Sequence, residues 1–303
     1  MPRTSAETAV PETPSRTGAS GTTVAATAAV WLIWGSTYLG IEVAIESIPP
    51  YTMQGIRFVV ASVAVLLWVR RRPVPRPSGA QVRNAAGIGV LLLVGGLGSV
   101  TLAEDWGVDT GLVATIIAIQ PLLMSLWGGV WGEWPRSREW VGMAIGLAGV
   151  VVLVSDDGLS GSVGGVVLVV AASVSWSCGS ALSRRVSMPT GAYTTGIEMA
   201  AAAVVFLAAG ALRGERVESV SGRSVVAVVY LTVFGSILAF SAFTHLIANV
   251  RPALAMSYAY VNPLIAVVLG VAFADESAST NMLIALPVIM SGVAVVISAP
   301  SRR

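Results

Sequence analysis

The sequence predicts an all-α integral membrane protein, with ten transmembrane helices arranged as two inverted repeats of five. Three observations support this prediction: the composition, the lengths of the apolar blocks and an internal repeat. The 303 residues are 55% hydrophobic and 11% charged, whereas a soluble domain carries about 25% charged residues. Mean hydropathy is +0.79. This composition indicates a chain that crosses a lipid bilayer several times.

The apolar residues gather in blocks of roughly 20, about the number that a helix needs to cross ~30 Å of hydrocarbon. Residues 1–21 precede the first block, are rich in Thr, Ser, Ala and Pro, and predict a disordered cytoplasmic tail. In the fifth block, the glycines of GMAIGLAG (142–149) predict close helix contacts. The predicted spans cover residues 23–44, 51–69, 84–103, 111–131, 138–154, 163–182, 193–212, 225–247, 253–273 and 280–298.

The distribution of arginine predicts the orientation of these spans. All 18 basic residues are arginines. If the N-terminus is cytoplasmic, the outer loops hold three of them (213, 216 and 223), and one lies within a span. The other fourteen lie in inner segments, at positions 3, 16, 70, 71, 72, 76, 83, 136, 138, 184, 185, 251, 302 and 303. This asymmetry follows the positive-inside rule and predicts a multi-pass protein of the plasma or inner membrane with both termini in the cytoplasm.

The internal repeat appears when the sequence is shifted over itself by 142 residues. Trp34 then falls on Trp176, and the pair Gln120-Pro121 falls on Asn262-Pro263. The two copies cover residues 22–154 and 162–298, with five predicted spans each. Because five is odd, the second copy enters the membrane from the opposite side, which predicts repeats related by a pseudo-two-fold axis in the membrane plane. Secondary transporters commonly have this arrangement and bind substrate between the repeats.

The residue inventory argues against several classes of protein. The chain contains no lysine, which excludes a Walker A loop and Schiff-base catalysis. It has one histidine and one cysteine, His245 and Cys178, and therefore no cluster with the spacing of a metal site. The arginines lie in loops and tails, where they set orientation rather than bind nucleic acid. We expect no catalytic residues, no cofactor, no metal and no nucleic-acid partner, and no pattern specifies an oligomeric state.

The repeated amide-proline pairs mark the fourth span of each repeat. An interior proline removes a backbone hydrogen bond and costs roughly 3 kcal/mol in a helix. Pro121 and Pro263 therefore predict helix breaks, and Gln120 and Asn262 beside them predict polar groups that line a cavity and bind substrate. The alternative is that the prolines are structural kinks only.

Three ionisable side chains fall within or near the ends of spans: Arg57, Glu198 and His245. Such residues are costly in a membrane and mark functional hypotheses. Arg57 and Glu198 lie in repeat-equivalent spans that start on opposite faces, so a rise of 1.5 Å per residue separates them by roughly 12 Å in depth. We expect Arg57 to face the outer vestibule and attract carboxylates. Glu198 would favour cations or protons at the inner side, and Glu198 and His245 are candidate proton sites. Snorkelling with structural hydrogen bonds is the alternative.

Aromatic residues predict a further part of a substrate site. The repeat-matched pair Trp34 and Trp176 lies within spans, away from the interfacial belts. With Tyr38, Tyr258 and Tyr260, they predict an aromatic wall suited to aromatic or cationic substrates. Helix packing alone is the alternative.

Several stretches resemble a known family. WLIWGSTYLGIEVAIESIPP (31–50) with GIRF (55–58), EWVGMAIGLAGVVVL (139–153) and SYAYVNPLIAVVLGVAFADE (257–276) are similar to EamA-domain proteins of the drug/metabolite transporter (DMT) superfamily. The spellings WGSTYLGIE and SYAYVNP are similar to the YedA-like branch of bacterial exporters. The resemblance implies ten helices in two EamA repeats, cytoplasmic termini and a central cavity that opens to alternating sides. Glu42 departs from the pattern, where a basic or neutral residue is expected.

These observations favour a secondary active transporter that exports small metabolites, amino-acid-like compounds or drugs through a central cavity. Its partners would be a small-molecule substrate, the lipid bilayer and, as a hypothesis, a coupling proton. Three alternatives stay open: an uptake permease, an integral membrane enzyme, and a lipid-handling or structural membrane protein. The direction of transport rests on the resemblance alone.

Overall fold

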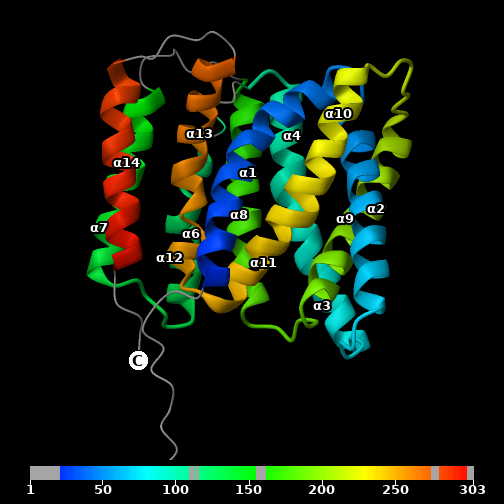
Figure 1. The fold of residues 1–303 in the computed structure, drawn as a ribbon, viewed down its shortest axis with the longest axis horizontal. Coiled ribbons are helices and arrows are strands. Elements are labelled where there is room, and N and C mark those ends of the chain that lie inside the picture. Colours follow the sequence, from blue (N-terminus) through cyan, green and yellow to red (C-terminus); the bar gives the residue numbers. More distant parts are fainter. Residues whose placement is uncertain (1–20, 109–112, 114–115, 155–161, 274–279, 299–303) are drawn as a thin grey trace, which may run out of the picture.

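A computed structural model describes residues 21–108, 113, 116–154, 162–273 and 280–298. Every regular element in these ranges is a helix, which confirms the predicted all-α class (Figure 1). The elements are α1 (Gly21–Ile45), α2 (Pro50–Arg70), α3 (Gly79–Gly89), η1 (Val90–Gly98), α4 (Ser99–Asp105), α6 (Gln120–Val130), α7 (Ser137–Val154), α8 (Val163–Ser183), α9 (Ala192–Arg213), α10 (Gly222–Tyr230), η2 (Leu231–Ala239), α11 (Phe240–Asn249), α12 (Pro252–Ala255), α13 (Tyr258–Phe273) and α14 (Thr280–Ser298). The predicted tail, residues 1–21, lies almost entirely outside the described ranges.

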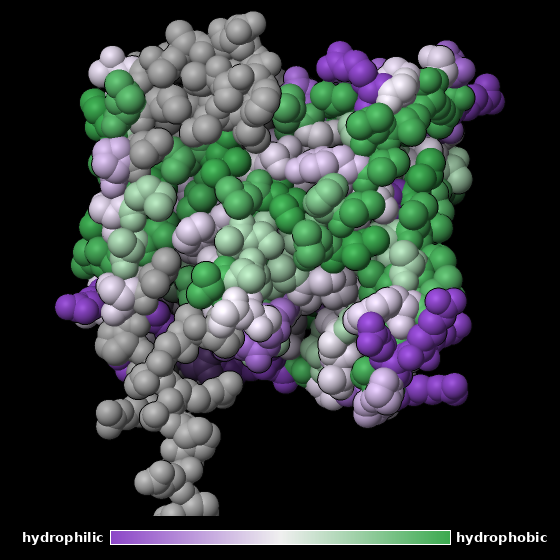
Figure 2. All heavy atoms as spheres, in the orientation of Figure 1, coloured by the Kyte–Doolittle hydropathy of each residue, from purple (hydrophilic) through white to green (hydrophobic). Residues whose placement is uncertain are grey.

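Among the described residues, six continuous helical stretches are long and apolar enough to cross a membrane. Two of them combine several elements: α3, η1 and α4 form one stretch, and α10, η2 and α11 form another. Their outward surface is apolar, and Figure 2 shows a hydrophobic band across the molecule with hydrophilic residues toward its ends. The six stretches cover residues 21–45, 50–70, 79–105, 163–183, 192–213 and 222–249.

Of the two prolines predicted to break helices, only Pro121 lies at a helix end. Pro121 is in the first turn of α6, where the missing N–H has no helical partner to lose. Pro263 lies inside α13, which continues to Phe273, so the prediction of a break at Pro263 was wrong. In that repeat the chain turns at Met256–Ser257 instead, between α12 and α13. Residues before a proline avoid helical geometry, but this preference does not determine where the helix ends.

Repeat-equivalent helices pack against each other in antiparallel fashion. An added Cβ at Gly55 of α2 would lie 2.5 Å from Leu207 of α9, and one at Gly196 of α9 would lie 2.7 Å from Leu66 of α2. Gly55 and Leu66 move onto Gly196 and Leu207 under a shift of 141 residues. The two contacts are therefore the same contact made twice, as a two-fold relation between the repeats requires.

The last helices of the two repeats, α7 and α14, approach each other backbone to backbone. An added Cβ at Gly292 would lie 2.6 Å from the backbone nitrogen of Gly146, and one at Gly142 would lie 2.8 Å from the carbonyl oxygen of Gly292. The expected close helix contact of the 142–149 glycines is confirmed. As with α2 and α9, each helix of this pair comes from a different repeat.

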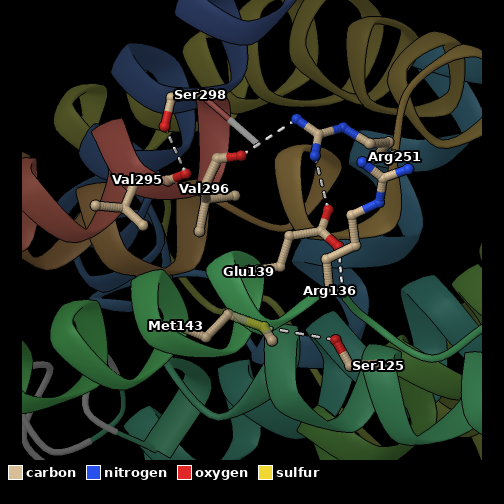
Figure 3. Close-up of polar contacts among 8 residues, drawn as sticks. All are labelled: Ser125, Arg136, Glu139, Met143, Arg251, Val295, Val296 and Ser298. Atoms are coloured by element: carbon tan, nitrogen blue, oxygen red, sulfur yellow. Dashed lines mark hydrogen bonds and ion pairs between the residues drawn. The ribbon is translucent and has the colours of Figure 1, made fainter. Parts of the chain in front are cut away.

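Polar contacts join the two repeats at the end of the bundle where α2 ends and α7 begins, which we call the arginine-rich end (arginines 70–72, 136, 138, 184, 185 and 251). Arg251 donates from Nη1 to Oε1 of Glu139 (2.8 Å) and from Nη2 to the Val296 carbonyl (3.2 Å). The other carboxylate oxygen of Glu139 accepts from the backbone N–H of Arg136 (3.0 Å). Figure 3 shows Glu139 of α7 bonded to Arg251, which lies just before α12, and Arg251 in turn bonded to Val296 of α14.

At the opposite end of the bundle, Glu215 fixes the start of α2. Its carboxylate accepts hydrogen bonds from the backbone N–H groups of Tyr51 (3.2 Å) and Thr52 (2.7 Å) and from the Thr52 hydroxyl (2.7 Å). These N–H groups have no partner within the helix, and a negative charge there is favoured by the helix dipole. The loop after α9 therefore anchors α2, the helix that carries Arg57.

Candidate functional site

The third helix of each repeat contains a π-helical segment, and the two segments are equivalent. η1 covers residues 90–98 and η2 covers residues 231–239, which the shift of 142 places on 89–97. π-helical turns occur frequently at functional sites. In both segments a glycine allows a close approach: an added Cβ at Gly96 would lie 2.7 Å from the Trp176 ring, and one at Gly235 would lie 2.9 Å from the Arg57 guanidinium. The π segments therefore bring these two side chains against the backbone.

Between these segments lies a central cavity of about 70 Å³. Residues of α1, α2, η1, α4, α6, α8, η2, α11 and α13 line it, so both repeats contribute. Of the nine residues expected to bind substrate, seven line this cavity: Trp34, Tyr38, Arg57, Gln120, Trp176, Tyr258 and Asn262. Glu198 and Tyr260 do not.

The aromatic wall of the central cavity forms around Trp34. The Trp34 ring meets Trp176 edge-on, with 5.4 Å between centroids, and Tyr258 at 4.9 Å. Its indole N–H donates to the Gly235 carbonyl (3.3 Å). Phe243 lies 5.0 Å from Trp34 and completes the cluster. The repeat-matched tryptophans are thus in direct contact, and aromatic pairs of this geometry stabilise by about 0.5–1.5 kcal/mol beyond their buried area.

Arg57 is buried in the central cavity and is held by neutral groups. It is 3% exposed, and its Nε donates to the Ser236 hydroxyl (2.7 Å). A longer contact joins Nη1 to the Gln54 side-chain oxygen (3.4 Å), and Gln54 in turn donates to Thr101 (2.8 Å). Within the described ranges no carboxylate pairs with Arg57. A buried charge without a counter-ion is costly, so this site can favourably receive an anionic group.

Among the other polar groups of the central cavity, some form hydrogen bonds and some do not. The Tyr258 hydroxyl donates to Gln120 Oε1 (2.7 Å), which joins α13 to α6. The indole N–H of Trp176 and the side-chain oxygen of Asn262 are buried and have no hydrogen-bond partner among the described residues. Buried polar groups are normally satisfied. A donor and an acceptor left unused in one cavity are suited to a bound polar molecule.

Glu198 and His245 line a second cavity, of about 650 Å³, between α2, α9 and α11. Figure 2 shows a hollow in this part of the surface, beside the lower end of α11. Both candidate proton sites therefore lie outside the central cavity. Arg57 and Glu198 form no ion pair, as expected.

Tyr260 does not belong to the aromatic wall, and this part of the prediction was wrong. It is buried in the cluster formed with α7 and α14, and an added Cβ at Gly146 would lie 3.0 Å from its ring. Tyr258 and Tyr260 are two residues apart, which places their side chains on nearly opposite faces of a helix. Phe240, which sequence reasoning missed, lines the cavity together with Ser236.

Sequence reasoning also missed Glu104. It lies in α4, one residue past the predicted end of the third span, yet the helix continues to Asp105. Both of its carboxylate oxygens are buried and without a hydrogen-bond partner in the described part of the chain. The acidic pair directly after an apolar block could have identified it, because an acid near a span end is costly wherever the helix continues.

Comparisons with known proteins agree with this architecture. The model of the EamA-like transporter family matches residues 21–155 and 163–298. The chain is 43% identical over 269 residues to the "Uncharacterized inner membrane transporter YedA" of Escherichia coli (strain K12), covering 88% of each protein. It is 25% identical over 160 residues to the "Probable amino-acid metabolite efflux pump" of the same organism, covering 52% of each. A solved crystal structure shares the fold with a TM-score of 0.78 at 24% identity, over 92% of this chain and 99% of the other.

Proposed function

The chain belongs to the EamA-like transporter family, whose members are membrane transporters rather than enzymes, and we propose that it is a secondary active exporter of small amino-acid-like metabolites or drugs. Transport proceeds by alternating access through the central cavity. The efflux pump among its relatives supports the export direction. The similarity to an inner membrane transporter supports the location in the cell membrane.

We further propose that the chain crosses the membrane ten times, as inverted repeats over residues 22–154 and 162–298, with both termini in the cytoplasm. The antiparallel packing of α2 with α9 and of α7 with α14 supports the inversion, because an axis in the membrane plane reverses the direction of each equivalent helix. The arginines gathered at one end support the orientation. That end is the cytoplasmic one.

The observation that carries the proposed site is the set of unsatisfied groups in one cavity between the repeats. Arg57 offers a guanidinium without a described counter-ion, Trp176 an N–H and Asn262 an oxygen acceptor. A molecule with a carboxylate, a nearby donor and an apolar or aromatic body would satisfy all three and contact the rings around Trp34. Amino acids and their derivatives have this chemistry.

The proposal is tested by efflux from cells that overexpress the protein. Amino acids, metabolites and toxic organic cations are loaded, and their loss is compared with that from cells carrying an empty vector. We expect at least one carboxylate compound to leave faster with the wild-type protein. Replacing Asn262 by alanine removes the acceptor, and we expect efflux affinity to fall about tenfold, the size of one buried hydrogen bond of roughly 1–3 kcal/mol.

Leu212→Ala is the matched control, because Leu212 is 89% exposed on α9 and lines neither cavity. It should transport like the wild type. If the wild-type protein instead speeds the accumulation of a panel compound, the protein is an uptake permease. If no compound moves in either direction, the transport proposal for this panel's chemistry is wrong.

A further inference from the structure

The second cavity lies at the arginine-rich end and is fixed by close helix packing. Its lining comes mainly from the end of α2, the start of α9 with the segment before it, and the length of α11, and η1, α8 and η2 contribute one residue each. α3 packs so tightly on α9 that an added Cβ at Gly89 would lie 2.5 Å from the Glu198 Cα atom. The backbone of Glu198 is therefore held in place at the wall of this cavity.

Glu198 is the acidic group of the described lining of this cavity, and its carboxyl group forms no ion pair with a described residue. The side chain is 1% exposed, and Oε2 has no hydrogen-bond partner within the described residues. The described lining contains no arginine and no second acid. The other titratable side chain, His245, contacts Asn249 of its own helix (3.3 Å). Thr195 and Thr244 also line the cavity, and their hydroxyl groups share a hydrogen bond (3.1 Å).

The rest of the lining is largely apolar. Phe243, Ile237 and Trp68 supply a hydrophobic wall of the cavity. A buried carboxyl group without a partner is unfavourable, and an ammonium group that enters with it satisfies the charge while an attached apolar body displaces water from the wall. An anion would be disfavoured, because its negative charge would lie beside that of Glu198.

We propose that the second cavity is a binding site for organic amines, in which Glu198 pairs with the ammonium group and the apolar wall holds the rest of the molecule. This assigns opposite chemistry to the two cavities: a carboxylate site at Arg57 and an amine site at Glu198. The proton count of the pair is the same whether a carboxylate meets an ammonium group or a neutral carboxylic acid transfers its proton to a neutral amine.

The two cavities are neighbours across the π-helical segments. Leu93 of η1 and Ser236 of η2 line the central cavity, whereas the adjacent residues Leu92 and Ile237 line the second. The two cavities therefore lie on either side of the same two segments. That the second cavity is an access site on the export path rests on the proposed function, whereas amine binding at Glu198 does not.

Binding of radiolabelled 2-phenylethylamine to the purified full-length protein in lipid nanodiscs tests the proposal, with neutral 2-phenylethanol as the matched ligand. The wild type should prefer the amine over the alcohol, and Glu198→Gln should lower amine affinity at least about tenfold while leaving the alcohol unchanged. Arg57→Gln should keep the amine preference, because Arg57 lines the other cavity. Unchanged amine affinity in Glu198→Gln would overturn the proposal.

A second variant covers the case in which Glu198→Gln does not fold. Ala64→Trp adds bulk from the exposed side of α2 and leaves Glu198 in place. It should weaken binding of both ligands, and full retention of amine binding would also overturn the site. Loss of panel efflux with intact amine binding would count against the exporter and not against this site, so the two proposals fail separately.

Discussion

Arg57→Gln is expected to abolish the preference of the transporter for carboxylates. Arg57 is buried, pairs only with neutral groups among the described residues and faces the central cavity. Losing a buried charge pair with the substrate costs about 2–5 kcal/mol, which is about 30-fold or more in affinity. The measurement compares efflux of a transported acid with efflux of its amide. The wild type should favour the acid, and the variant should export the two alike.

Two controls separate this effect from loss of folding. Removing a buried charge that has no counter-ion does not destabilise a fold as removal of one partner of an ion pair does, so expression and thermal stability of Arg57→Gln should match the wild type. Arg57→Lys keeps the charge but not the bidentate geometry and should retain part of the preference. An unchanged preference for the acid in Arg57→Gln would show that carboxylates are recognised elsewhere.

Gly235→Ala is expected to reduce transport about tenfold or more without harming the fold. The added methyl group would lie 2.9 Å from Nη2 of Arg57 and 3.2 Å from Cγ2 of Thr37, so the guanidinium must move within a cavity of about 70 Å³. The end of a long side chain can shift, and alanine favours a helix over glycine by about 1 kcal/mol. The thermal unfolding temperature of Gly235→Ala should therefore be no lower than that of the wild type, whereas its efflux rate should fall.

Gly87→Ala is the matched control for this change. Gly87 is helical in α3, and an added Cβ there meets nothing within 4 Å. It should leave transport unchanged. If Gly235→Ala transports as well as the control, the position of the Arg57 guanidinium does not limit transport.

The repeat allowed much of the central cavity to be predicted. A two-fold relation between repeats predicts that equivalent residues near the axis lie near each other, and the 5.4 Å separation of the Trp34 and Trp176 rings fits this prediction. The amide residues 120 and 262 follow the same logic and line the same cavity. The all-helical class followed from composition, because only helices or closed barrels satisfy backbone polar groups in hydrocarbon.

The misses have physical causes. Tyr260 was grouped with Tyr258 by residue type, although helical periodicity sends the two rings to opposite faces. Pro263 is tolerated inside α13, so the proline did not locate the break. The π-helical winding of η1 and η2 changes which of their side chains face the cavity. Because each segment lies within a continuous apolar run, its composition does not reveal this winding. Ser236 and Phe240 were missed because their facing depends on this local winding.

The most direct test of the central cavity as the substrate site is protection of an introduced thiol. The single native cysteine is replaced (Cys178→Ala), and Val100→Cys places a thiol in the lining without removing any polar group proposed to bind substrate. A transported acid from the efflux panel should slow maleimide labelling there severalfold and leave labelling at Leu212→Cys, outside both cavities, unchanged. Equal labelling of Val100→Cys with and without saturating substrate, in a variant that still transports, would contradict the central cavity as the binding site.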